Sequence, residues 1–434
     1  MKLITMLLLA AQYLFRYRRR YLFLFLALAF GFGIISFIRA AKDGMAENVY
    51  FSARGHYAGD IVIRGDNADY SHADHFDGED TAFILETAEQ LQLDPSGTAV
   101  RTDLYGRASV YFNGAVMPLK YVQGIDWENE AAYFSALSYD GLPGNPGDDT
   151  MLLSEPLAKS LGIRQGDSVV LETETGGAAK NTGVFVIAGI IRDSSIFGYY
   201  KAYIARETLN SLIGFDAGDC SFIGFTFKDH SRTPQKTVLL RNALAQKFPT
   251  APFLRDREDY NFERSKNWEG LRVFVLTIPV FLSEVDQLLN AMDILSYLLY
   301  GMMLIIIMVS AGVTYRLILH ERVREIGTMR AIGFYERDVQ FILVLEALGL
   351  GILSLIAGFF FARLLSAVLA RLSFAWFPGF EIFLRNGRLT ALYLPKTTVI
   401  NILAVFCMLL PSIWFLSFRV TRNHLPLLLN GDTL

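Results

Sequence analysis

The sequence predicts a membrane protein with an α-helical domain of four transmembrane spans and a large, two-lobed α+β extracytoplasmic domain between spans 1 and 2. Three observations predict this architecture. Apolar residues make up 52% of the 434 residues, which is more than an ordinary soluble chain carries. They gather in four runs with almost no charge, one near the N-terminus and three in the last third of the chain. Residues 41–286 instead alternate short apolar segments with Gly, Asp and Asn, as water-exposed domains do.

Composition also excludes several classes of protein. The chain has 40 basic and 43 acidic residues, so its formal charge of −3 gives no positive field that would attract nucleic acid. The high apolar content excludes a disordered chain. Only Cys220 and Cys407 occur, and only Cys407 lies in an apolar run, so we expect no disulfide framework.

Residues 1–40 are expected to hold an interfacial helix and the first span. The apolar residues 3–11 follow Lys2, a pattern that a secretory signal would also show. No small-residue cleavage site follows, and the arginine cluster at residues 16–20 precedes a longer apolar run at residues 21–38. We therefore expect a helix at the membrane interface that leads into a span.

Residues 41–286 are expected to form the outer domain. Apolar and β-branched residues recur at period two in five stretches, which predicts strands at residues 60–64, 108–112, 168–171, 184–191 and 221–227. Helical patterns occupy residues 81–93, 155–161 and 237–247. The stretch 141–149 is rich in Gly, Pro and Asp and is expected to be a loop or hinge between two lobes.

Residues 287–434 are expected to hold three more spans, at about residues 292–316, 339–363 and 397–418, because a bilayer core needs about 20 apolar helical residues. Only Glu346 interrupts the charge-free run of the third span. An ionisable group at membrane depth is either functional or paired with a basic flank or a neighbouring helix. The sequence leaves both interpretations of Glu346 open.

Basic residues at the ends of the spans indicate the orientation. The N-terminal flank is basic, and the segment between spans 2 and 3 carries Arg316, Arg322, Arg324, Arg330 and Arg337. The positive-inside rule places both segments in the cytoplasm. With four spans, both termini are then cytoplasmic and the large domain is extracytoplasmic. The basic residues of the predicted outer loop weaken the rule there: Arg371, Arg385, Arg388 and Lys396.

Residues 320–334, which read HERVREIGTMRAIGF, form the most informative segment. Val323, Ile326 and Met329 recur at helical spacing, and the charges between them make a polar surface of mixed sign. Gly327 is expected to end the helix that extends span 2, and Gly333 to cap a short helix before span 3. A short helix tied to two spans can move them when a partner docks on it. The alternative is a solvated loop whose arginines only satisfy the positive-inside rule.

This string closely resembles the cytoplasmic signature of the MacB/FtsX-type permeases of ABC transporters, in which the segment is the coupling helix that seats on the ATPase subunit. Residues 152–171 and 184–212 resemble the family's extracytoplasmic core, and residues 411–429 resemble its C-terminal pattern of proline, basic turn and Pro-x-x-Leu-Leu. The resemblance implies that ten residues couple the chain to the ATPase: Glu321, Arg322, Arg324, Glu325, Ile326, Gly327, Met329, Arg330, Ala331 and Gly333.

The size of the outer domain favours MacB and the lipoprotein-releasing (LolC/LolE-like) permeases over the smaller division protein FtsX. The phosphate-binding motif GxxxxGK[ST] is missing, which separates the chain from MacB, whose ATPase is on the same chain, and makes it most similar to the LolC/LolE-like permeases. Residues 172–183 are short and Gly-rich, so the hook-like insertion by which LolC recruits a chaperone is not expected. The resemblance implies a place in the bacterial cytoplasmic (inner) membrane and a second permease chain, identical or homologous. It also implies a lipid-anchored or hydrophobic substrate such as a lipoprotein.

Several chemical sites are not expected. No Gly-Lys dipeptide occurs, so the phosphate-binding motif GxxxxGK[ST] is missing, and ATP and Mg²⁺ are expected on a separate ATPase subunit. The chain itself is expected to be non-catalytic, without a cofactor or a metal. His320 and Glu321 begin like a zinc-protease motif, but Arg324 stands where the second ligand is needed. A solvated acidic loop is favoured over a metal site at His72, Asp74, His75 and Asp77.

The leading hypothesis is a permease subunit that uses ATP hydrolysis by its partner, through mechanotransmission, to extract or export a lipid-anchored or hydrophobic substrate. One alternative keeps the architecture without transport: an FtsX-like relay that activates an extracytoplasmic partner, such as a cell-wall hydrolase or a sensor kinase. The other alternative is a membrane-anchored receptor domain with no ATPase.

Overall fold

The computed structural model describes residues 3–16, 18–67, 75–135, 137–140, 146–175, 177–192, 201–374, 376–377, 380–385 and 387–421. The chain divides into two compact units. Unit 1 comprises Met1–Met45, Asn290–Leu372 and Leu389–Leu434, and unit 2 comprises Ala46–Leu289 and Ser373–Arg388. The predicted domain limits, after residues 40 and 286, fall inside two long helices that have residues in both units.

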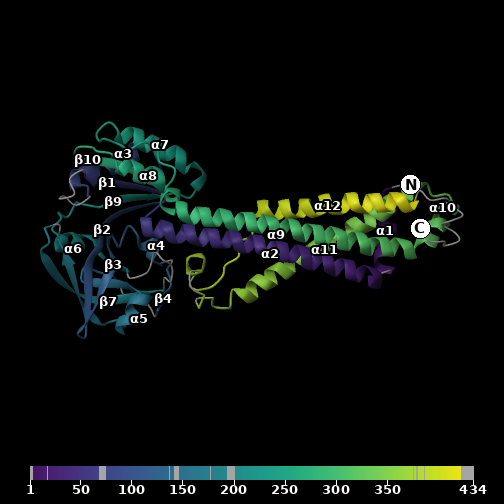
Figure 1. Ribbon diagram of the computed structural model, residues 1–434, viewed down its shortest axis with the longest axis horizontal. Coiled ribbons are helices and arrows are strands. Elements are labelled where there is room, and N and C mark those ends of the chain that lie inside the picture. The colour runs from purple at the N-terminus through teal and green to yellow at the C-terminus, as the bar shows by residue number, and fades with distance from the viewer. Residues whose placement is uncertain are drawn as a thin grey trace. The chain divides into compact units, whose positions relative to one another are not determined.

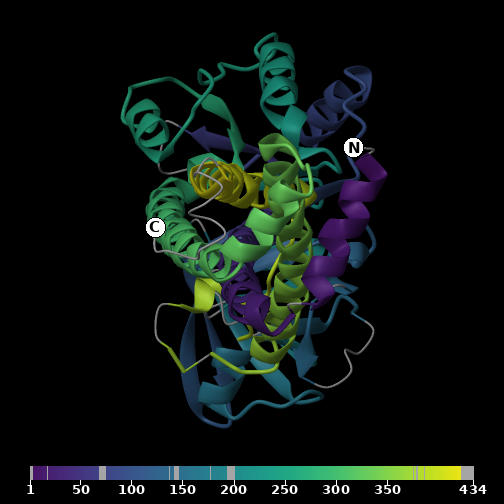
Figure 2. The same cartoon turned by 90° about the vertical axis from the view of Figure 1, so that its right-hand side faces the viewer.

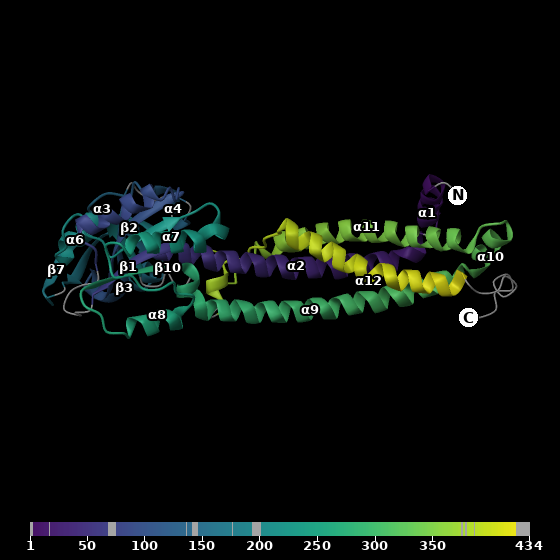
Figure 3. The ribbon, with the colours of Figure 1, turned by 90° about the horizontal axis from the view of Figure 1, so that it is seen from above.

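Four long apolar helices run lengthwise together in Figure 1 and Figure 3. They are α2 (Arg18–Tyr57), α9 (Ile278–Glu321), α11 (Glu336–Leu369) and α12 (Pro395–Thr421). Each contains one of the predicted spans and is long and apolar enough to cross a membrane. An α+β domain lies between the first and second of them along the chain, so the predicted fold class is confirmed.

The N-terminal helix α1 (Leu3–Arg16) packs on α11 within unit 1. Met6 and Ala10 of α1 form a small apolar cluster with Ile342 of α11. Figure 2, which looks along the bundle, shows α1 in purple standing beside it. The structure therefore contains the predicted helix before the first span, and its position at a membrane interface stays a prediction.

The helices α2 and α11 touch through their backbones. A Cβ atom added to Gly358 would lie 2.5 Å from the carbonyl oxygen of Ala29, and one added to Gly33 would lie 2.9 Å from the carbonyl oxygen of Gly358. Small residues permit such close packing between membrane helices, where van der Waals contact takes the place of hydrophobic burial. At this point the backbones of α2 and α11 are therefore in direct contact.

Unit 2 is built on one sheet of ten strands. The strands are β1 (Ile61–Asn67), β2 (Gly97–Phe112), β3 (Ala115–Ile125), β4 (Tyr139–Asp140), β5 (Thr150–Ser154), β6 (Ser168–Glu174), β7 (Lys180–Ile191), β8 (Lys201–Ala205), β9 (Phe222–Thr226) and β10 (Leu271–Thr277). Its helices are α3 (Gly78–Gln90), α4 (Ala131–Ser135), α5 (Glu155–Leu161), α6 (Arg206–Ile213), α7 (Thr233–Leu244) and α8 (Arg257–Arg264).

The long strand β2 belongs to both halves of this sheet. Its residues 97–101 pair with β9, and the order β10-β1-β9-β2 forms one half, where α3 and α7 share an apolar core with the strands. Its residues 102–112 pair with β3, and β6 pairs with both β2 and β7, so the other half closes into a barrel. The two halves are thus linked by a shared strand. Residues 141–145 of the predicted hinge lie outside the described residues.

Every strand and helix predicted for the outer domain overlaps an observed element of the same type. The strands β3, β4, β5, β8 and β10 were not predicted. The strands β5 and β8 are five residues long and largely buried, and so short a segment is equally compatible with a buried helix. Both cysteines are free, with Cys220 buried in unit 2 and Cys407 exposed on α12.

Replacing Gly358 by leucine is expected to separate α2 from α11, since the new side chain would meet the backbone of Ala29. We expect Gly358→Leu to lower the Tm of the detergent-purified protein by several degrees or to prevent folding. Gly312→Leu on α9 is the matched control, because no atom lies within 4 Å of a Cβ at that position. Equal Tm values for the two variants would contradict the backbone contact.

Candidate functional site

The junction between spans 2 and 3 folds as a separate short helix, α10 (Val323–Ala331). Gly333 has a φ of +106°, and its N–H donates to the carbonyl of Arg330 while the N–H of Phe334 donates to the carbonyl of Met329. These two bonds are the Schellman motif that ends many helices, so the predicted cap at Gly333 is confirmed. The prediction for Gly327 is wrong: Gly327 is buried within α10, and α9 ends at Glu321, before Arg322.

One face of α10 is buried in the bundle. Val323 and Ile326 are buried, and Ile326 belongs to the same apolar cluster as Tyr21 of α2 and Val339 of α11. Met329 is partly buried and lies 3.9 Å, through its sulfur, from the hydroxyl of Tyr13. The helical spacing of the apolar residues therefore marks the face of α10 that packs on the spans.

Arg322, at the turn between α9 and α10, is fully buried and joins several helices. Its Nη1 atom lies 2.6 Å from Oε2 of Glu346 on α11 and donates to the hydroxyl of Tyr21 at 3.1 Å. Tyr21 of α2 donates to the same carboxylate oxygen at 2.8 Å. The Nε atom of Arg322 donates to Glu325 at 3.2 Å, and its guanidinium lies over the ring of Tyr13 at 4.7 Å.

This buried ion pair gives Glu346 a structural partner. A buried charge is tolerated in an apolar bundle only when an opposite charge and hydrogen bonds compensate it. The carboxylate of Glu346 receives both from Arg322 and Tyr21. The sequence left open whether Glu346 is functional or paired with a basic residue. In the structure it is paired, and its partner Arg322 comes from the basic segment between spans 2 and 3.

The burial of Arg322 corrects its assignment to the surface that meets a partner. The side chain is 0% exposed, and Ile326 and Gly327 are also buried, so a docking subunit cannot touch these three residues. Among the remaining predicted coupling residues, the partly buried ones are Glu325, Met329 and Arg330, and the exposed ones are Glu321, Arg324, Ala331 and Gly333. Arg330 pairs with Glu336 at 2.7 Å, which ties the end of α10 to the start of α11.

Two large apolar side chains stand beside Gly333 in solvent. Ile332 is 80% exposed and Tyr335 is 78% exposed. Sequence periodicity does not identify these two residues, because it is uninformative in the turn between two helices. Their exposure could have been predicted, because the isoleucine and the tyrosine stand in a charged segment that is too short to bury them.

A second charged cluster, in unit 2, holds the C-terminal end of α2. Arg101 of β2 is 1% exposed, pairs with the buried Glu130, and donates through Nη1 to the carbonyls of Gly55 and His56 at 2.8 and 3.3 Å. Gln123 of β3 also donates to the His56 carbonyl. Burial opposes the charge on Arg101, but Glu130 raises its pKa, so the guanidinium stays charged. A cation at the C-terminus of a helix also offsets the helix dipole.

The histidine and carboxylate residues considered for a metal site have other roles where they are described. Asp77 caps α3, since its carboxylate accepts from the N–H of Asp80 at 2.7 Å. His75 stacks on Phe215 with ring centroids 4.3 Å apart. His72 and Asp74 lie outside the described residues.

Residues 297–425, which contain the α9–α10–α11 junction, match the family described as FtsX-like permease C-terminal. This part of the chain is therefore similar to the FtsX-like permease family. FtsX-like permeases are typically non-catalytic transmembrane subunits of ABC systems. The matched region contains α11, α12 and part of α9, which are three of the four helices long and apolar enough to cross a membrane.

No curated protein matches the chain. The solved structures that match it include two with sequence identities of 12% and 13%. The periplasmic region of MacB from Actinobacillus actinomycetemcomitans superposes with a TM-score of 0.32 and covers 54% of this chain and 95% of its own. A domain ascribed to a permease of Porphyromonas gingivalis gives a TM-score of 0.26 and covers 50% of this chain and 88% of its own.

Removing the acidic partner of Arg322 is expected to destabilise the bundle. Glu346→Ala leaves a buried guanidinium without its carboxylate, which costs about 3–5 kcal/mol when a buried pair is broken from one side. The double variant Arg322→Met/Glu346→Met removes both charges and should recover most of the lost Tm in thermal unfolding of the purified protein. Single and double variants with the same loss of Tm would argue against the pairing.

Arg101→Met is expected to loosen the end of α2. It strands Glu130 and removes the donor to the Gly55 and His56 carbonyls, so we expect a loss of about 3–5 kcal/mol in the stability of unit 2 within the full chain. The matched control is Arg192→Met, whose partner Asp140 lies 2.8 Å away on the surface. That variant should unfold at the same urea concentration as the unmodified protein. A similar shift in both variants would contradict the special role of Arg101.

Proposed function

We propose that this chain is the permease subunit of an ABC complex in which a separate ATPase subunit, which binds ATP and Mg²⁺, acts on α10. One observation carries the proposal: the junction around α10 has two different sides. Its inner side is buried against the spans, next to the Arg322–Glu346 pair, whereas its outer side presents charged residues and, in the turn after α10, the exposed side chains of Ile332 and Tyr335. A helix that only connected two spans would need neither a buried ion pair on its inner side nor exposed apolar side chains on its outer side.

The exposed side of the junction has the chemistry of a protein interface. We define the docking face as Glu321, Arg324, Ala331, Ile332, Gly333 and Tyr335, all of which are exposed. Apolar anchors surrounded by charges of both signs are typical of interfaces, because the anchors supply affinity and the charges supply register. Aromatic residues such as Tyr335 are enriched among interface hot spots. Arg322, Ile326 and Gly327 then act from inside, by holding the docking face to the spans.

Motion of α10 has a continuous path along the chain. Arg322 links it to Glu346 on α11 and to Tyr21 on α2. The helices α2 and α9 each continue without interruption from unit 1 into unit 2. At the end of α2, the donors from Arg101 and Gln123 hold the last carbonyls. We propose that force from the ATPase reaches the outer domain along these helices, which is mechanotransmission.

The proposed substrate is lipid-anchored or otherwise hydrophobic, such as a lipoprotein. The helix α9 exposes a row of apolar side chains at helical spacing: Ile294, Leu298, Met302, Ile305, Val309, Val313 and Leu317. The helix α2 exposes Phe23, Leu26 and Phe30. Such rows face lipid, a second permease chain, identical or homologous, or an acyl chain that enters from the side. The likeness to LolC/LolE-type permeases stays part of this proposal.

The proposed orientation follows from the same assignment. If α10 meets an ATPase, both termini and α10 are cytoplasmic and unit 2 is extracytoplasmic, in the inner membrane of a bacterium. The arginines of the segment between spans 2 and 3 agree with this orientation. Mass spectrometry of proteins crosslinked to unit 2 distinguishes a lipid-anchored cargo from the alternative, a cell-wall hydrolase activated by an FtsX-like relay.

Charge reversal on the docking face is expected to release the ATPase. In membranes from the native host, Arg324→Glu combined with Ile332→Asp should lower the amount of ATPase that co-purifies with the tagged chain at least about tenfold, because one apolar anchor and one charge are lost. The chain itself should remain inserted and folded, since neither side chain is buried.

Arg371→Glu is the control for this experiment. Arg371 is equally exposed but follows α11, at the opposite end of that helix from α10. It should leave the recovered ATPase unchanged. If the docking-face variant retains its ATPase, or if the unmodified chain recovers none, α10 is not the coupling element.

A further inference from the structure

The loop between α11 and α12, residues 370–394, carries two exposed aromatic side chains. Trp376 is 75% exposed and Phe377 is 51% exposed, and their rings meet edge to face with centroids 5.8 Å apart. We call this pair the aromatic tip. Two spans separate the loop from the α+β domain along the chain, so both lie on the same side of the membrane. An exposed apolar patch marks a surface that meets a membrane or another molecule.

The aromatic tip belongs to an ordered segment. A row of rings continues from the tip through Phe380 to Phe383, with centroids 5.9 and 5.7 Å apart, and Phe383 is buried. Asn48 of α2 donates to the carbonyl of Phe383 at 3.0 Å, and the guanidinium of Arg385 lies 4.6 Å from the ring centre of Phe51. All of these residues belong to unit 2. One end of the row is therefore fixed on α2, while the tip at its other end is exposed.

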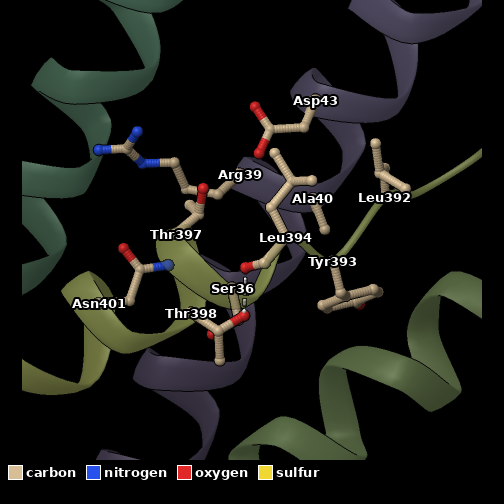
Figure 4. Close-up of a pocket in the computed structure, with 10 residues that line it drawn as sticks. All are labelled: Ser36, Arg39, Ala40, Asp43, Leu392, Tyr393, Leu394, Thr397, Thr398 and Asn401. Atoms are coloured by element: carbon tan, nitrogen blue, oxygen red, sulfur yellow. Dashed lines mark hydrogen bonds between the residues drawn. The ribbon is translucent and has the colours of Figure 1, made fainter. Parts of the chain in front are cut away.

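Both ends of the loop leave the bundle where the apolar runs of the spans end. The N–H of Leu392 donates to the carbonyl of Ala40 at 2.7 Å, two residues past the apolar run of the first span (Figure 4). The hydroxyl groups of Tyr393 and Ser366 lie 2.6 Å apart, just past Arg363, where the apolar run of α11 ends. The guanidinium of Arg363 lies over the ring of Tyr393 at 4.9 Å. Tyrosine and arginine are typical of the membrane surface, so we place the bilayer surface at this level.

The apolar side of α11 continues past this level toward the tip. Its exposed apolar residues recur every four positions: Phe360, Leu364, Val368 and Leu372. Each is at least half exposed, and residues spaced by four share one face of a helix, as on the lipid-facing side of a span. Trp376 follows Leu372 by four residues, which extend over at most about 14 Å. The tip is therefore within a short distance of a stripe that faces lipid.

The charges of the loop favour a phospholipid surface as the partner of the tip. Residues 370–394 contain three arginines and one acidic residue, Glu381. Arg385 and Arg388 are exposed. Arginine near the membrane surface is attracted to the negative charge of lipid headgroups, and tryptophan is enriched at the same depth.

We propose that the aromatic tip inserts into the outer leaflet of the bilayer, with Arg385 and Arg388 on the lipid phosphates. The loop is then a lipid anchor, and through Asn48 it holds the adjoining part of α2 to the membrane surface. The anchor also explains why this loop is basic although the positive-inside rule disfavours basic residues outside. The inference uses the spans and the loop alone, so it goes beyond the proposed function and does not depend on it.

Electron paramagnetic resonance of a nitroxide at position 376 tests the proposal. The full chain carries Trp376→Cys together with Cys407→Ala, because Cys407 is exposed whereas Cys220 is buried. It is reconstituted into vesicles of phosphatidylethanolamine and phosphatidylglycerol. Oxygen concentrates among acyl chains and a nickel chelate stays in water, so the ratio of their relaxation effects reports whether the label is in lipid or in water. We expect the ratio at position 376 to shift from the value of a water control to that of a lipid control.

Phe360→Cys on α11, at a side chain that is 69% exposed, is the lipid control. Tyr105→Cys on β2, at a side chain that is 62% exposed, is the water control. A ratio at position 376 equal to that of Tyr105→Cys would overturn the proposal, because the tip would then stand in water. Low access of both reagents would also overturn it, because a second copy of the chain or another protein would then cover the tip.

A second label keeps the test decisive if Trp376→Cys does not fold. A nitroxide at Ser373→Cys, which is exposed, is measured with and without Trp376→Ser/Phe377→Ser. Loss of the aromatic tip should move this label toward the water value, and an unchanged ratio would overturn the proposal. Neither measurement needs an ATPase, so the result is independent of docking on α10.

Discussion

The membrane part of this protein depends on one buried charge pair. Arg322 and Glu346 lie in an apolar bundle, where either charge alone would be strongly unfavourable. Each therefore requires the other to stay in place, and Tyr21 requires both. This mutual requirement fixes where α9 ends, which side of α10 faces inward, and how α11 stands beside α2. A loop between two spans becomes an element of defined orientation for this reason.

Much of this fold was accessible from the sequence, because the information is local. The four spans are runs of apolar residues, and their length alone indicates membrane helices. Gly333 was identified as a cap because the end of a helix depends on a few neighbouring residues. Five strands of unit 2 were predicted from stretches in which apolar residues alternate. Short buried strands such as β8 lack alternation and escaped notice.

The remaining features depend on contacts between distant parts of the chain. Arg322 looked like one of several surface arginines, and its partners lie 24 and 301 residues away. Gly327 looked like a helix end, yet the break occurs at Arg322, where the charge pair turns the chain. No local sequence pattern predicts such contacts between distant residues.

The glycine contact between α2 and α11 has a mechanical consequence. Because Gly33 and Gly358 let the two backbones touch, turning α2 about its own axis would press side chains into the neighbouring backbone. We therefore expect α2 and α11 to move as one rigid body, so that a rotation applied to one helix is transmitted to the other. In contrast, Gly301 and Gly312 of α9 face open space. Where α9 meets α2 beside Gly31, the contact is made by the side chain of Ile307, and a side chain can repack where two backbones cannot.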